Sequence, residues 1–153
     1  MKLSTREDIA APIEAVFREI SDFDGFERAA LRRGAEVVRT DSLTAAGVGM
    51  TWRAQFPFRN RERQADLELL DHDVPNGLTL FSRISGVETT VVVELVALSR
   101  VRTRMNMSID LKPKSIPARL MIQSLKLAKT NMTKRFHRRV ADFSADIEDR
   151  HSA

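Results

Sequence analysis

Apolar and polar residues alternate with a period of two along much of the chain, which predicts a protein built mainly from antiparallel strands. Such alternation places successive side chains on opposite faces of a sheet. In the clearest case, residues 101–112, every odd position is apolar or Thr and every even position is polar, as in a sheet with one dry face. The predicted strands are 3–9, 36–41, 50–56, 62–73, 78–84, 87–96 and 101–112.

Three other segments have the three-to-four-residue apolar spacing of amphipathic helices. The first, residues 13–20, follows Pro12, which suits the start of a helix, and the second, residues 22–33, ends before Gly34. The third is predicted to be one helix over residues 115–149, roughly 50 Å long at 1.5 Å per residue. Its apolar stripe consists of Met121, Leu125, Ala128, Met132, Phe136, Val140, Phe143 and Ile147.

Four short segments, placed within this order of elements, resemble the helix-grip fold of the SRPBCC superfamily. They are IAAPIEAVF (9–17), SDFD (21–24), GVGMTW (47–52) and LDHDVPNGL (70–78). The superfamily includes START-related, polyketide cyclase/dehydrase and lipid-transport proteins. The resemblance implies a single α+β domain over residues 1–153, with a curved antiparallel sheet of about seven strands wrapped on a long C-terminal helix. Two short helices would lie between strands 1 and 2.

The resemblance also implies a cavity, because in a helix-grip fold the helix does not fill the concave side of the sheet. Inward-facing residues of both would then contact an apolar ligand. The predicted ligand-binding residues are Met50, Trp52, Ala54, Leu67, Leu69, Leu80, Val91, Val93, Thr103, Met105, Met107, Met121, Leu125, Met132 and Phe136. Flexible Met side chains adapt well to irregular ligands. The same pattern is also typical of a filled core, and Trp52 fits either interpretation.

The residues that acid–base or metal chemistry requires are few. The chain has no Cys and no Tyr, and its three histidines do not have metal-ligand spacing. We expect His72, between two Asp residues, to be a solvated turn residue, while Glu7 shares a face with Leu3 and Ile9 and is a candidate to face inward. The sequence therefore predicts no metal and no cofactor, and it assigns no catalytic residue.

Charge is distributed unevenly along the chain. The net charge is +4, but residues 111–141 contain nine cations and no Asp or Glu, which leaves −5 for the rest. These cations are typical of a solvated helix face, or of a surface that makes transient contact with an anionic membrane. The residues assigned to that contact are Lys126, Lys129, Arg135, Arg138 and Arg139. Nucleic acid is disfavoured, because the segment lacks exposed aromatic residues on which bases stack.

Together these features predict a protein that binds or transports a hydrophobic small molecule, such as a lipid, a quinone or a polyketide-like compound. The alternative is a polyketide cyclase/dehydrase-like enzyme that uses the same cavity. No apolar run is long enough to cross a membrane, and the N-terminus lacks the apolar core of a signal peptide. We therefore expect a cytoplasmic location, and the sequence leaves the oligomeric state open.

Overall fold

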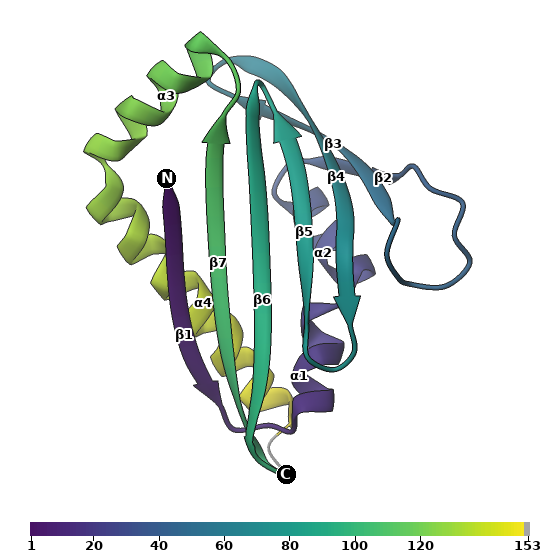
Figure 1. Ribbon diagram of the computed structural model, residues 1–153. Helices are drawn as coiled ribbons and strands as arrows, with labels where there is room; N and C mark the ends of the chain where they lie inside the picture. Colours follow the sequence, from purple (N-terminus) through teal and green to yellow (C-terminus); the bar gives the residue numbers. More distant parts are fainter. Residues whose placement is uncertain (152–153) are drawn as a thin grey trace.

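The computed structural model describes residues 1–151, which form a seven-stranded antiparallel sheet and four helices (Figure 1). The strands are β1 (Lys2–Ile9), β2 (Glu36–Arg39), β3 (Thr51–Phe58), β4 (Arg61–Asp73), β5 (Gly77–Ile84), β6 (Val87–Ser99) and β7 (Arg102–Pro113). The helices are α1 (Ile13–Ile20), α2 (Phe23–Arg32), α3 (Ile116–Leu127) and α4 (Lys129–His151). Along the sheet the order is β1-β7-β6-β5-β4-β3-β2, so the first and last strands are neighbours.

The main core lies between the concave face of the sheet and helices α1 and α4. Its centre contains residues from several elements whose side chains are completely shielded from solvent, namely Ile9, Val16, Leu69, Met105 and Ile147. The alternation in β7 explains this arrangement, because its odd positions lie on the concave face of the sheet and its even positions on the outer face, where they are half-buried or exposed. The predicted α+β architecture, with two short helices between the first two strands, is confirmed.

The C-terminal helical region differs from the prediction in one respect. The long helix is α4, and the residues before it form a separate helix, α3, with a break at Ala128, where φ is −103° and ψ is 15°. The Ala128 N–H donates to the Leu125 carbonyl at 2.9 Å, which closes α3 with a tight final turn. Figure 1 shows the chain changing direction at this point. The apolar spacing continues through the break, so the sequence pattern alone does not reveal it.

The two helices separate because they pack on different clusters. Helix α3 buries Ala118 and Ile122 against Val87 in a small second cluster. Helix α4 buries Val140 and Ile147 in the main core. On one ideal helix Ile122, Val140 and Ile147 would fall within about 20° of one another, so the break at Ala128 changes the direction of the helix axis and not the side on which the apolar stripe lies.

The segment between β2 and β3 is held by the Asp41 carboxylate. It accepts hydrogen bonds from Arg39 Nε at 2.8 Å and from the backbone N–H groups of Thr51 at 2.8 Å and Leu43 at 2.9 Å. The Arg39 guanidinium and then the Thr51 N–H lower the pKa of Asp41 well below its usual value near 4. The pKa of Asp41 is lower in the folded chain than in the unfolded chain, so the ionised carboxylate stabilises the fold. This stabilisation is complete above about pH 4 and is lost as the pH falls further.

A β-bulge in β4 changes which side chains face the core. Register along the β4–β5 pair shifts between Leu69 and Asp71, so that Leu70 is the extra residue. Strict alternation would direct His72 to the outer face, but the bulge places it opposite Leu78, on the concave face.

Candidate ligand-binding cavity

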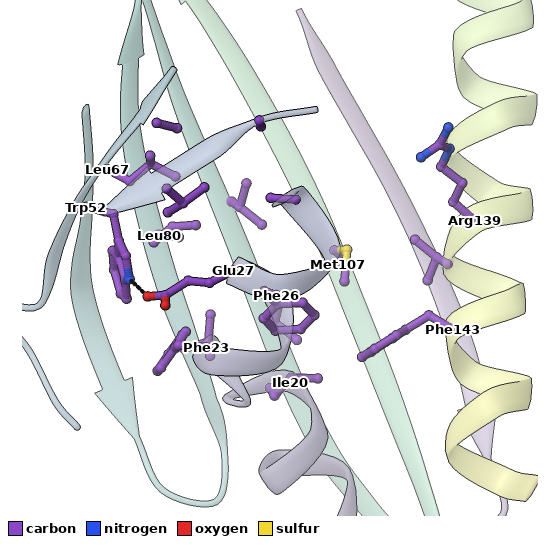
Figure 2. A pocket seen from close by; sticks show the side chains of 18 of the residues that line it. Ile20, Phe23, Phe26, Glu27, Trp52, Leu67, Leu80, Met107, Arg139 and Phe143 are labelled. Carbon is purple, nitrogen blue, oxygen red and sulfur yellow. Dashed lines mark hydrogen bonds between the residues drawn. The ribbon is translucent and has the colours of Figure 1, made fainter. Parts of the chain in front are cut away.

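A cavity of about 570 Å³ lies between the concave face of the sheet, helix α2 and helix α4 (Figure 2). Its size is in the range of cavities that hold small organic ligands. The sheet contributes Val37, Trp52, Ala54, Leu67, Leu78, Leu80, Val91, Val93 and Met107. The helices and the residues beside them contribute Ile20, Phe23, Phe26, Glu27, Ala30, Ala35, Phe136, Arg139, Val140 and Phe143.

Helix α2 forms one wall of the cavity without being part of the core. None of its residues is fully buried, although it has a clear apolar side. Two aromatic contacts position this side (Figure 2). The Phe23 ring lies 5.3 Å from the Trp52 ring on β3, and the Phe26 ring lies 6.1 Å from the Phe143 ring on α4. Phe23, Phe26 and Ala30 of α2 therefore face the cavity, where a ligand would cover them, whereas Leu31 is exposed outside it.

Two ionisable side chains interrupt the apolar wall, and they differ in the interactions that they make with other residues. Glu27 on α2 accepts a hydrogen bond from Trp52 Nε1 at 2.8 Å. Arg139 on α4 extends toward the cavity from the opposite side (Figure 2) and has no ion-pair partner within residues 1–151. Arg39 lies near the indole of Trp52, with its Cζ 5.8 Å from the ring centroid. The cavity thus combines an apolar interior, a hydrogen-bonded Trp–Glu pair and one solvent-exposed arginine that forms no ion pair among the described residues.

Eight of the fifteen sequence-predicted ligand-binding residues are on the cavity wall: Trp52, Ala54, Leu67, Leu80, Val91, Val93, Met107 and Phe136. The other seven are not on the wall. Met50, Leu69 and Met105 are fully buried in the main core. Thr103 is also buried, and its hydroxyl donates to the Ala11 carbonyl at 2.8 Å.

The remaining three predicted ligand-binding residues belong to the helical region after β7. Met121 and Leu125 pack on the second cluster beneath α3, and Met132 is half-buried on α4. They were assigned to the cavity because one straight helix was expected to lie along the whole sheet. The break at Ala128 directs the α3 residues away from it.

The wall also contains residues that the sequence analysis did not assign to a site. The largest group comes from the end of α1 and from α2, namely Ile20, Phe23, Phe26, Glu27 and Ala30. Their apolar spacing predicted a helix but not the surface that it covers. Val140 and Phe143 belong to the predicted apolar stripe of the C-terminal helix and Leu78 to a predicted strand, but none of them is a predicted ligand-binding residue. For Arg139 the sequence predicts only membrane contact.

The expectation that His72 is a solvated turn residue is wrong. The β4 bulge turns its ring inward, where its centroid lies 5.2 Å from Phe17 and 6.4 Å from Phe23. Its Nε2 atom is buried without a hydrogen-bond partner. His72 therefore lies behind the cavity wall rather than on it. The other two histidines make contacts elsewhere, His137 with the Ser4 carbonyl at 3.0 Å and His151 with Glu19 at 3.3 Å.

No group of three or more His, Cys, Asp or Glu side chains within residues 1–151 is placed to hold a metal ion. In the same range, no helix combines the length and the apolar character needed to cross a lipid bilayer.

No protein-family model matches the sequence, and no curated protein is significantly similar to it. Solved structures do share its fold. The crystal structure of TTHA0849 from Thermus thermophilus matches 99% of this chain over 100% of its own, with a TM-score of 0.68 and 16% identity. The Zhui aromatase/cyclase from Streptomyces sp. R1128 matches 100% of this chain over 96% of its own, with a TM-score of 0.69 and 13% identity.

A third structure, that of Ara h 8.0201, matches 96% of this chain over 97% of its own, with a TM-score of 0.61 and 10% identity. At such low identities the likeness concerns the fold alone. The helix-grip fold that the sequence resemblance implied is confirmed.

Proposed function

We propose that this chain, which has the helix-grip fold of the SRPBCC superfamily, binds a hydrophobic small molecule in the cavity between its sheet, α2 and α4. One observation carries the proposal. The cavity of about 570 Å³ is walled by apolar side chains from both the sheet and the helices. Transferring an apolar ligand from water to such a wall is favourable by about 25 cal/mol per Å² of apolar surface buried.

The two ionisable side chains on the wall indicate which polar group the ligand carries. Glu27 accepts a hydrogen bond from Trp52 Nε1, whereas Arg139 is exposed and forms no ion pair among the described residues. A guanidinium donates well to carboxylate, sulfonate or carbonyl oxygens. We therefore propose a ligand with a flat or flexible apolar body and an oxygen-bearing, preferably anionic, group that reaches Arg139. Lipids, quinones and polyketide-like compounds all fit this description.

The alternative is an enzyme that acts like a polyketide cyclase/dehydrase, and the fold of the Zhui aromatase/cyclase favours it. Such an enzyme needs a group that exchanges a proton at the cavity wall. Glu27 is the one candidate among the wall residues, because an Arg side chain does not lose its proton near neutral pH. A carboxylate that accepts one hydrogen bond keeps further acceptor sites, so Glu27 is still available for proton exchange. Binding is the better-supported function because it requires only the apolar wall, whereas an enzyme would depend on this single side chain.

A dye titration with cavity variants tests the binding proposal. The probe is 8-anilinonaphthalene-1-sulfonate, an apolar aromatic anion that can quench Trp52, the single Trp of the chain. In Ala54→Phe a ring would occupy the cavity, whereas the matched control Gln55→Phe places the same ring on the outer face of β3. We expect Ala54→Phe to weaken dye binding at least tenfold and Gln55→Phe to leave it within about twofold.

Circular dichroism must show that both variants are folded. Val91→Phe, which also places a ring in the cavity and adds no second Trp, serves as a second blocking variant. Equal dye affinity in the blocked and control variants would contradict the proposal. So would a failure of the parent protein to bind the dye.

A second comparison tests the role of Arg139. N-phenyl-1-naphthylamine has the same rings as the first dye but no sulfonate. We expect Arg139→Gln to lower the affinity for the sulfonated dye about tenfold, which corresponds to about 1.4 kcal/mol of binding free energy. The affinity for the neutral dye should change little. Arg138→Gln, which removes an exposed neighbouring cation that is not on the wall, is the matched control. Parallel losses for both dyes would contradict an anion contact at Arg139.

The predicted cytoplasmic location and the predicted contact with an anionic membrane both extend this proposal. A cytoplasmic location suits a Cys-free chain, and separation of cytosolic and membrane fractions with an antibody would test it. An anionic membrane is a suitable source for an apolar ligand, and the basic C-terminal residues would favour contact with it.

A further inference from the structure

We propose that the outer face of α3 docks onto the surface of an anionic lipid membrane. This docking face consists of Ile116, Leu120 and Leu127. Their side chains are large and apolar, yet 76%, 60% and 92% of their respective surfaces are exposed. Within residues 1–151 no other segment covers them.

Helix geometry places the three residues on one side. At 3.6 residues per turn, positions 116, 120 and 127 fall within about 40° of one another around the axis. The residues that α3 buries, Ala118 and Ile122, lie on the opposite side. The helix is therefore apolar toward the protein and largely apolar toward solvent, where Gln123 is the polar residue on the same side. An ordinary surface helix has a polar outer face, so the outer apolar face of α3 is not explained by folding.

The charges beside the docking face indicate which kind of partner it contacts. Arg119 and Lys126 border it along one flank of α3, Lys129 follows the end of the helix, and all three are exposed. None of them forms an ion pair with another residue in the described part of the chain. Residues 111–141 contain no acidic side chain to offset them. Apolar side chains flanked by cations complement an anionic lipid surface, where the apolar groups enter the interface and the cations meet the headgroups.

The position of α3 allows such contact. Figure 1 shows the helix at the outer margin of the fold, beyond the edge strand β1, while α4 runs back along the sheet. The break at Ala128 gives α3 a direction of its own. Contact at this face does not use the cavity residues, so docking and ligand binding are separable properties.

Vesicle flotation tests the proposal with vesicles of phosphatidylcholine containing 30% phosphatidylserine, and with vesicles of phosphatidylcholine alone. We expect the full chain to float with the anionic vesicles at low salt and to be released as salt increases. Leu120→Gln combined with Leu127→Gln should weaken binding at least tenfold. The matched control, Val96→Gln combined with Val101→Gln, removes two apolar side chains that are 51% and 67% exposed in the β6–β7 hairpin and should change binding less than twofold.

Three results would overturn the proposal. The first is no binding to anionic vesicles, and the second is equal loss of binding in the two double variants. The third is a dimer, detected by sedimentation velocity, that the α3 variant dissociates while vesicle binding is unaffected, since the occupant would then be a second copy of the chain. The cavity variant Ala54→Phe should still float. Flotation of this variant would show that vesicle binding does not depend on the cavity, so the docking proposal and the cavity proposal can be refuted separately.

Discussion

Two neighbouring leucines on one face of the sheet provide a direct test of the cavity. Leu69 on β4 and Leu80 on β5 are register partners across the strand pair. Leu69 is completely buried in the main core, whereas Leu80 is half-buried and lines the cavity. Changing each to Ala removes the same atoms from neighbouring positions, so the difference between the two variants reports on what surrounds each side chain.

The structure predicts different costs for the two substitutions. Loss of three carbons from a buried site costs about 2.4 kcal/mol in transfer free energy. Leu69→Ala also leaves a new void in packed surroundings, so we expect a total of about 3–5 kcal/mol. Leu80→Ala enlarges a space that already exists and gives up less buried area, so we expect about 1–1.5 kcal/mol, roughly half of the transfer free energy.

Urea denaturation followed by circular dichroism measures both values. In a chain of this size, each kcal/mol corresponds to a change in melting temperature of roughly 2–4 °C. Thermal melts should therefore separate the two variants by several degrees. Equal destabilisation would refute the reasoning, because it would mean that Leu80 is packed as tightly as Leu69 and that no cavity lies beside it.

Three further predictions concern single positions. His72→Phe should raise the free energy of unfolding by about 1 kcal/mol, because it removes a buried nitrogen without a partner next to Phe17; a lower urea midpoint would contradict this. Asp41→Asn should flatten the fall of melting temperature below about pH 4, since the parent loses its ionised Asp41 there; melts with parallel pH profiles would argue against it. Gly77→Ala should cost at least about 3 kcal/mol, because its Cβ would lie 2.1 Å from the Val93 carbonyl oxygen; an unchanged melting temperature would rule out this close approach.

Sequence patterns predict structure reliably where one periodicity continues without interruption. The alternation of residues 101–112 predicts both the strand β7 and its buried face, because a strand has only two faces and burial selects one of them. The apolar spacing of residues 13–20 likewise predicts α1, and three of its four buried residues, Val16, Phe17 and Ile20, belong to that spacing.

Local exceptions to periodicity are less visible in the sequence. The bulge at Leu70 reverses the faces of the residues that follow it, so that His72 turns inward although its neighbours are acidic. The break at Ala128 occurs in a segment whose residues are compatible with a continuous helix. In both places the residues concerned fit the uninterrupted periodicity equally well, so no local pattern marks the exception.

The sequence by itself determined the order of strands and helices, the inward faces of most strands and the excess of cations in residues 111–141. Tertiary structure alone decided which apolar residues became core and which became cavity wall. Phe23 and Leu69 are both apolar and both follow the expected spacing, yet Phe23 faces a space and Leu69 is enclosed. The physical reason is that hydrophobic patterning specifies a direction for each side chain, whereas the distance to the opposing surface depends on how the sheet curves and where the helices lie.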